Sequence, residues 1–343
     1  MMRRWLLCTL LLPLFCAGFG VGARAQTQTG TGSCTADYSD IIFANNGKGV
    51  DILSTQPIDG VGQITVKCSN LATGFKARVC LGMNPALIND PKMVNQSDLK
   101  SVLIYDIFTN EARTDPWYSQ QKKRPYVDVD PAKATPPVSV YGRIRARQSA
   151  SPIGQYIDNV TPPFRYFIYK YQGPSSVPDC DSPGYNRTTM GVKVTALITP
   201  NCKFTSKPND MEFKDPSGVT GIIAKELTAQ TELNLSCTTN APYSVGLGPG
   251  DHNPSRGAET RYMCKTEVKV GSVDEAKCIK YGLYTDNGLP WGLTDPLGSG
   301  ADSKPRKASS SGEKITVNGK MPKPDKSPAP GFYSDQITVT VNF

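Results

Sequence analysis

The chain has 343 residues, a length that suggests about two domains. Its formal net charge is +8, and subtracting three arginines of an N-terminal segment that we expect to be removed (Arg3, Arg4 and Arg24) leaves +5. This charge is spread along the chain and forms no polybasic helix, so nucleic acid is not expected as a partner.

Residues 1–25 have the pattern of a secretory signal peptide. Arg3 and Arg4 precede a short apolar run at residues 5–15, and Ala23 and Ala25 precede a plausible cleavage site before Gln26. The run is too short to cross a bilayer. We expect export and cleavage, with a retained signal anchor as the alternative.

Eight cysteines remain after removal of the signal, and an even count in an exported chain predicts disulfides. No closely spaced cysteine pair or cysteine–histidine cluster suggests zinc. We therefore expect no metal and no cofactor. The cysteines concerned are Cys34, Cys68, Cys80, Cys180, Cys202, Cys237, Cys264 and Cys278.

The two halves of the chain match each other in order, which predicts a duplicated domain. Cys34 and Cys68 are 34 positions apart, and Cys202 and Cys237 are 35 apart. Four further matches follow in the same order and roughly in register: residues 103–110 with 279–286, Trp117 with Trp291, residues 138–143 with 315–320, and residues 154–158 with 331–335. The expected domains are residues 26–189 and 190–343.

The repeat also limits the disulfide pairing. Dividing eight cysteines into two groups of four leaves nine of the 105 possible pairings. The matched spacing favours Cys34–Cys68 and Cys202–Cys237. Cys80–Cys180 and Cys264–Cys278 then remain in the two halves.

Short segments of alternating apolar and polar residues predict antiparallel strands throughout. About six strands in ~150 residues indicate an all-β fold in which each domain is a sandwich of two sheets. In chain order the expected strands are residues 63–67, 76–81, 102–108, 138–141, 163–171, 192–198, 232–236, 243–247, 280–284, 314–317 and 336–343.

The halves differ after their last matched segment. The first half continues through Cys180 to the strand-like residues 192–198, which can complete its own sandwich. The strand at residues 336–343 has no such continuation in the sequence. Its apolar face and its edge therefore need to be covered or paired.

The second half resembles the spore coat protein U family, the domain of subunits of archaic (Csu-type) chaperone–usher pili. The resemblance is carried by residues 235–237, 242–247, 281–286, 291–292, 315–319 and 331–343, and the first half carries a weaker copy. Two such domains in one chain resemble the tip subunit of a pilus.

The resemblance implies two immunoglobulin-like sandwiches in tandem, of which the C-terminal one lacks its seventh strand. A periplasmic chaperone and then an adjacent pilus subunit would donate that strand, with assembly through an outer-membrane usher. The implied location is extracellular, at the pilus tip. The acceptor groove is expected to contain Val192, Val194, Ile198, Ile337, Val339, Val341 and Phe343.

The N-terminal residues 26–33 are polar and contain two glycines, so they offer no apolar strand to a neighbouring subunit. This also favours a place at the end of a fibre. Attachment to an abiotic or host surface, and biofilm formation, are then expected of loops in the first domain. The candidate contact residues are Pro85, Leu87, Ile88, Trp117, Tyr118 and Ile153.

Alternatives accompany these hypotheses. Trp117 aligns with Trp291, so it can instead be a core residue. A basic loop, residues 122–124, can contact anionic groups or simply be solvated. The chain can also be a structural cap that initiates assembly without adhesion, or carry a carbohydrate-binding lectin domain in its first half. An enzyme is not expected, because nothing pairs a nucleophile with the only histidine, His252.

Overall fold

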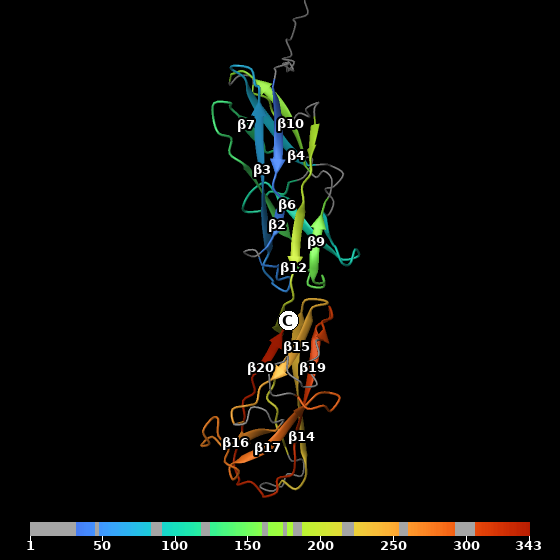
Figure 1. Cartoon of the computed structure of the whole chain (residues 1–343), viewed down its shortest axis with the longest axis vertical. Coiled ribbons are helices and arrows are strands. Elements are labelled where there is room, and N and C mark those ends of the chain that lie inside the picture. The colour runs from blue at the N-terminus through green and yellow to red at the C-terminus, as the bar shows by residue number, and fades with distance from the viewer. Residues whose placement is uncertain are drawn as a thin grey trace, which may run out of the picture.

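The computed structural model describes residues 32–44, 48–83, 91–117, 124–159, 164–173, 177–180, 187–214, 223–253, 260–291 and 306–343. These residues form strands, turns and loops without a helix, so none of them belongs to an apolar helix long enough to cross a membrane. Figure 1 shows two strand-rich domains that follow one another along the long axis of the molecule. The expected all-β fold is confirmed.

Within the described residues, the first domain contains the following strands: β1 (Ser33–Tyr38), β2 (Ile41–Phe43), β3 (Ile58–Ser69), β4 (Lys76–Met83), β5 (Lys92–Asn95), β6 (Val102–Phe108), β7 (Tyr126–Val129), β8 (Val138–Ile144), β9 (Gly154–Asp158), β10 (Phe164–Tyr171), β11 (Arg187–Met190) and β12 (Val194–Ile198).

The first domain is built from two sheets. Eight strands pair in the order β1-β3-β2-β12-β9-β5-β6-β8, and β3 also pairs with β8, which closes this sheet on itself. A second sheet has the order β11-β10-β4-β7. Phe43 packs inside the closed sheet against Gly60 and Gly142, where an added Cβ would lie 2.9 Å and 2.8 Å from its ring. Glycine is therefore needed at both positions.

The second domain has fewer strands in its described part. They are β13 (Cys202–Phe204), β14 (Leu227–Cys237), β15 (Pro242–Leu247), β16 (Arg261–Cys264), β17 (Cys278–Tyr284), β18 (Arg306–Lys307), β19 (Glu313–Met321) and β20 (Val339–Asn342). One sheet has the order β13-β14-β19-β17-β16, and the other has the order β18-β15-β20.

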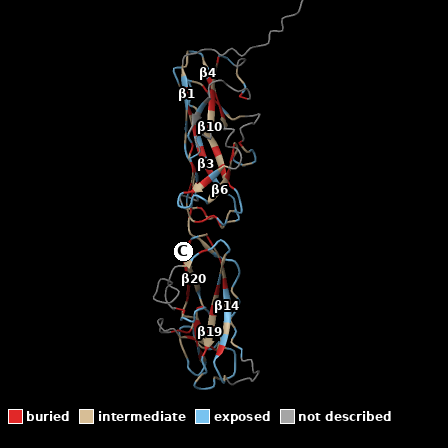
Figure 2. Ribbon diagram, turned by 90° about the vertical axis from the view of Figure 1, so that its right-hand side faces the viewer, coloured by how far each residue is buried: buried red, intermediate tan, exposed pale blue. Residues whose placement is uncertain are grey.

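The strand pairings confirm the internal repeat. β13–β14 repeats β1–β3, and the pairs β14–β19, β17–β19 and β16–β17 repeat β3–β8, β6–β8 and β5–β6. In the smaller sheet, β15 pairs with β18 and β20 as β4 pairs with β7 and β10. In both domains, buried positions alternate with exposed or partly exposed ones along the strands (Figure 2). Each domain therefore has its own apolar core.

Four disulfides join the paired strands and their loops, and each expected pair is confirmed. Cys34–Cys68 links β1 to β3, and Cys202–Cys237 links β13 to β14 in the same way. Cys264–Cys278 joins β16 to β17, and Cys80–Cys180 joins β4 to the segment that leads to β11. The similar spacing of the first two cysteines in each half thus reflects the equivalent strand pairs β1–β3 and β13–β14 that they join.

The strand β12 belongs to the first domain, although the sequence placed it after the expected boundary at residue 189. It pairs with β2 and β9, and Val194, Ala196 and Ile198 are buried in the first core. The first domain therefore extends through residue 198. Its extra chain completes its own fold, as expected from the difference between the halves.

The two domains also contact each other. The backbone N–H of Ile153 donates to the carbonyl of Thr239 at 3.0 Å, and the Ile153 side chain packs against the core of the second domain. Lys203 forms an ion pair with Asp51 at 2.7 Å. Because both side chains of this pair are substantially exposed, it contributes little to stability.

Candidate functional site

The strand β12 occupies a specific place in the first domain, and that place defines the candidate site in the second. It runs parallel to β2 and antiparallel to β9, with Val194 opposite both Ile41 and Asp158. The preceding strand β11 pairs with β10. Together, β11 and β12 complete both sheets of the first domain.

One wall of the equivalent place in the second domain is an irregular segment, residues 209–213. The Thr231 hydroxyl donates to the carbonyl of Asn209 at 2.7 Å, which holds the segment against β14 as β2 lies against β3. Met211 and Phe213 pack on Gly319, as Phe43 packs on Gly142. Residues 209–213 therefore occupy the position of β2.

The opposite wall is the segment that leads into β20. Ser334 forms two backbone hydrogen bonds with Cys264 of β16, at 2.9 and 3.0 Å, as β9 pairs with β5. The Tyr333 hydroxyl donates to the carbonyl of Ala329, and the Tyr156 hydroxyl donates to the carbonyl of Pro152 four residues before it. Residues 331–335 therefore occupy the position of β9.

No described strand of the second domain lies between these two walls, where β12 lies in the first domain. The side chains there are only partly covered. Tyr333 is half-buried, whereas its counterpart Tyr156 is fully buried. We call this region the open groove and define it by Met211, Phe213, Tyr333, Ile337, Val339 and Val341, which pack partly buried against the second core.

A partly buried polar contact fixes the second wall. Asp335 accepts a hydrogen bond from the Tyr281 hydroxyl at 2.5 Å and another from the backbone N–H of Asp251 at 2.7 Å. Burial raises the pKa of the Asp335 carboxyl above its ordinary value. In the first domain, Tyr105 donates to Asp158 at 2.7 Å in the same way. The tyrosine–aspartate pair therefore anchors this segment in both domains.

A buried arginine distinguishes the second domain. Arg261 on β16 is fully buried, and its guanidinium donates to the carbonyls of Leu247 and Gly248, both at 3.0 Å. Burial lowers its pKa to about 10. The bonds tie the end of β15, which pairs with β20, to β16, so the two sheets are held together beside the groove.

The structure corrects the expected composition of the groove. Val192, Val194 and Ile198 are buried in the first domain and do not line it, because β12 pairs with β2 and β9. Ile337, Val339 and Val341 do lie on its apolar face, whereas Phe343 is 54% exposed. The strand begins at Val339, three residues later than expected, and residues 336–338 lead into it.

Two expected surface-contact residues are also corrected. Trp117 is buried, because its backbone N–H donates to Ile107 at 2.8 Å and its ring packs edge-on against Phe164. The alternative that it is a core residue, like Trp291, is confirmed. Ile153 packs against the second domain.

The other candidates, Pro85, Leu87, Ile88 and Tyr118, lie outside the described residues, as do the signal peptide and Lys122. The strands that flank them are described. The end of β4 pairs with the start of β10, and Cys80 near that end pairs with Tyr126 at the start of β7. The end of β4 and the start of β7 therefore lie at the same end of one sheet.

Sequence reasoning missed Met211, Phe213 and Tyr333 as groove residues. Tyr333 could have been found, because it matches Tyr156 in the repeat. Met211 and Phe213 lie in an irregular segment without strand periodicity, and only their packing on Gly319 reveals their role. Among the described residues, no group of three histidine, cysteine, aspartate or glutamate side chains could hold a metal ion.

Several solved structures are similar to this chain, at low sequence identity. The CsuC–CsuE chaperone–tip adhesion subunit complex of Acinetobacter baumannii matches with 14% identity and a TM-score of 0.47, covering 91% of this chain and 100% of that chain. The CupB6 tip adhesin of Pseudomonas aeruginosa matches with 7% identity and a TM-score of 0.33, covering 90% and 94%. No curated protein sequence matches the chain.

The sequence itself gives the decisive comparison. The profile of the Spore Coat Protein U domain matches residues 22–162 and again residues 188–340. The two matches correspond to the two halves of the repeat and together include most of the chain. The chain therefore belongs to the Spore Coat Protein U domain family, of which it contains two copies.

Proposed function

We propose that this protein is the tip subunit of a chaperone–usher pilus, attached to the fibre by a strand that another protein inserts into the open groove. The observation that carries the proposal is the contrast between the two domains. Both have the two walls, and only the first has a described strand between them. Strand addition at an exposed sheet edge is an established mode of protein recognition.

The first domain indicates which sequence the partner strand needs. Its own completing segment, residues 187–198, pairs first with β10 and then with β9. Alternate positions of its second part point into the core, where Val192, Val194, Ala196 and Ile198 are buried. A donated strand of about twelve residues, with apolar residues at alternate positions, would cover the groove in the same manner.

The direction of the donated strand follows from the same comparison. β11 and β12 run antiparallel to β10 and β9. An equivalent strand in the second domain starts beside β20, which Figure 1 shows near the first domain. It ends beside residues 331–335, which pair with β16 at the far end of the second domain. The rest of the donor then lies at the end of the second domain away from the first. This arrangement puts the first domain at the end of the fibre.

The partners in this account are a periplasmic chaperone, an outer-membrane usher and the adjacent subunit. The chaperone occupies the groove first, and the subunit replaces it. Co-expression of the chain with its chaperone tests this directly, because we expect a stable complex. Val339→Asp and Val341→Asp should abolish it, whereas Thr340→Asp, on the other face of β20, should not. Equal recovery of all variants would contradict the proposal.

We further propose that the first domain contacts an abiotic or host surface and so promotes biofilm formation. Leu87, Ile88 and Tyr118 belong to the chain segments after β4 and before β7, and the end of β4 and the start of β7 lie at one end of the same sheet. Apolar side chains exposed on loops can bind an apolar surface, and this is the role proposed for these three residues.

Attachment of cells to polystyrene distinguishes an adhesin from a structural cap. Leu87→Ser with Ile88→Ser should reduce attachment at an unchanged number of pili. Leu99→Ser serves as the control, because Leu99 is 74% exposed on a turn of the same domain. Unchanged attachment of the double variant would favour a cap that initiates assembly.

A further inference from the structure

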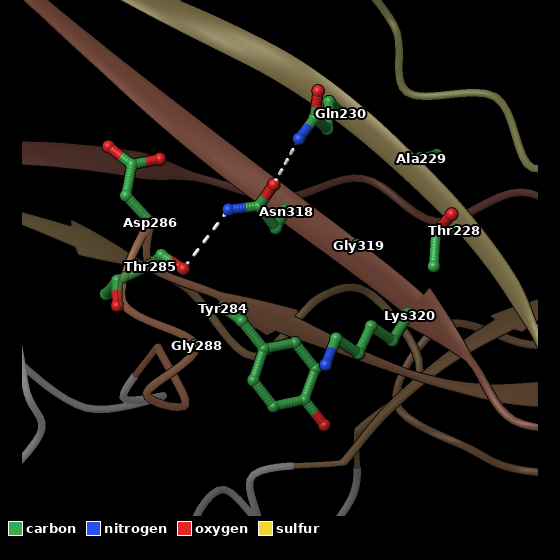
Figure 3. Close-up of a pocket in the computed structure, with 10 residues that line it drawn as sticks. All are labelled: Thr228, Ala229, Gln230, Tyr284, Thr285, Asp286, Gly288, Asn318, Gly319 and Lys320. Atoms are coloured by element: carbon green, nitrogen blue, oxygen red, sulfur yellow. Dashed lines mark hydrogen bonds between the residues drawn. The ribbon is translucent and has the colours of Figure 1, made fainter.

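The second domain carries a polar recess of about 570 Å³ on the outer surface of its larger sheet (Figure 3). Its floor is a grid of directly opposed positions on three strands. Tyr284, Asn318 and Gln230 form one row, and the next row is Gly282, Lys320 and Thr228. The turn after β17 forms one side with Asp286.

The same grid in the first domain has different chemistry. There the rows are Phe108, Tyr141 and Val61, and Asp106, Arg143 and Asp59. The charges of the second row are paired, because Arg143 binds Asp59 at 2.7 and 3.0 Å and Arg145 binds Asp106 at 2.9 and 2.8 Å.

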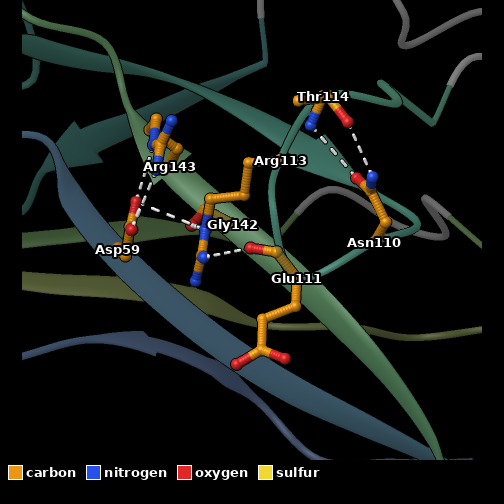
Figure 4. A network of polar contacts seen from close by, with 7 residues as sticks. All are labelled: Asp59, Asn110, Glu111, Arg113, Thr114, Gly142 and Arg143. Carbon is orange, nitrogen blue, oxygen red and sulfur yellow. Dashed lines mark hydrogen bonds and ion pairs between the residues drawn. The ribbon is translucent and has the colours of Figure 1, made fainter.

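Arg113 covers this grid in the first domain (Figure 4). Its guanidinium donates to the carbonyls of Gly142 at 3.2 Å and Glu111 at 2.7 Å, and it lies 3.3 Å from Asp59. Its side chain is only 10% exposed. The surface that is a recess in the second domain is thus filled in the first.

A shorter turn removes this cover from the second domain. In the first domain, a backbone hydrogen bond from the N–H of Thr109 to the carbonyl of Asp115 closes the turn. In the second domain, the matching hydrogen bond runs from Thr285 to Leu289, so this turn is two residues shorter. The position of Asp59 is taken by Thr228, so the carboxylate that held Arg113 is absent from the grid as well. The recess therefore lacks the carboxylate that an arginine side chain such as Arg113 would need there.

The groups that line the recess are mostly neutral and polar. Gln230 donates to the Asn318 side-chain oxygen at 2.6 Å, and the Asn318 amide donates to the carbonyl of Thr285 at 3.1 Å. These bonds fix the orientation of the central amide. Lys320 and Asp286 carry opposite charges, so the lining has no net charge. Such a set of donors and acceptors suits hydroxyl groups better than an ion.

An aromatic ring completes the floor. The Tyr284 ring lies along the sheet against Gly282, where an added Cβ would be 2.7 Å from the tyrosine hydroxyl. The Lys320 ammonium group lies over part of this ring, 5.0 Å from its centre. A ring held against a sheet can pack against the C–H face of a pyranose, while the amides and the ammonium group bind its hydroxyls.

We propose that this recess binds a neutral carbohydrate of one or two sugar units. Its volume lies within the range of about 300–1,000 Å³ that is usual for small-ligand sites. The proposal does not depend on the open groove, because the grid faces outward while the groove residues Met211 and Phe213 pack on the inward side of Gly319. It places carbohydrate binding in the second domain.

Saturation-transfer NMR on the full mature chain tests the proposal, with the methyl glycosides of glucose, mannose, galactose and N-acetylglucosamine at millimolar concentration as probes. We expect a signal from at least one probe. Gln230→Ala with Asn318→Ala should weaken binding about tenfold or more, a change of about 1.4 kcal/mol. Thr316→Ala, on the same face of β19 outside the recess, should leave it unchanged.

Thr228→Trp gives an independent test by filling the recess without removing an amide, and it should also abolish the signal. The unfolding transition of each variant shows that the domain is folded. Absence of a signal from all four probes would overturn the proposal. So would a signal that persists in the variants, or one displaced by N-acetylarginine amide, which would indicate a protein side chain as the ligand.

Discussion

Truncation of one buried side chain in β12 tests which domain that strand completes. Ile198 is 1% exposed in the first core. Replacement by alanine removes about three carbon atoms at ~0.8 kcal/mol each and leaves a cavity, so we expect a loss of about 3 kcal/mol. With a denaturant slope of about 2 kcal/mol per molar urea, the midpoint of the first domain should fall by about 1.5 M.

The tryptophans allow each domain to be measured separately. Trp117 and Trp291 are both buried, one in each core. Fluorescence of Trp117 in a Trp291→Phe background reports the first domain, and Trp291 in a Trp117→Phe background reports the second. Leu197→Ala is the matched control, because this neighbour in β12 is 51% exposed. If Ile198→Ala lowered the Trp291 midpoint and left the Trp117 midpoint unchanged, the assignment of β12 would be refuted.

Three further predictions concern the second domain, each read from its urea midpoint. Tyr281→Phe removes the hydroxyl that donates to the partly buried Asp335 and should cost about 1–2 kcal/mol, and an unchanged midpoint would contradict this. Burial raises the pKa of Asp335. Its contribution to the stability of the second domain is therefore complete below the pKa of the unfolded chain and is lost as pH rises through the pKa of the folded domain. Asp335→Asn should abolish this fall in stability with pH, and an unchanged pH profile of the variant would contradict the role given to Asp335. Cys264→Ser with Cys278→Ser removes a disulfide between residues 14 positions apart and should lower the free energy of unfolding by about 3 kcal/mol. A loss below ~1 kcal/mol would show that the pairing of β16 with β17 holds this part of the domain without the disulfide.

The features that could be predicted from the sequence are those whose pattern occurs in both halves of the chain. Strand alternation, cysteine spacing and the matched tryptophans all reflect contacts inside one domain, so two copies of the pattern support each other. The disulfide pairs and the all-β fold follow from this. The strand at residues 192–198 was also predicted, but alternation does not tell which sheet a strand joins.

The errors arise where the environment is supplied by distant residues. Trp117 follows a polar turn, and its burial depends on a backbone bond to Ile107 that brings it under Phe164. Ile153 precedes β9 in the first domain, and the second domain covers it. Neither contact leaves a periodic signal, because each is made by a single residue in an irregular segment.

The central claim is that the open groove takes a strand like the one between β2 and β9. The most direct measurement is the melting temperature of the second domain, read from Trp291, after residues 187–198 are appended behind Phe343. A linker of fifteen residues matches the natural interval between β10 and β11. We expect a gain of about 2–3 kcal/mol, or ~5–10 °C. The same segment with aspartate at the positions of Val194 and Ile198 should give no gain. An equal melting temperature for both fusions and the parent chain would contradict the claim.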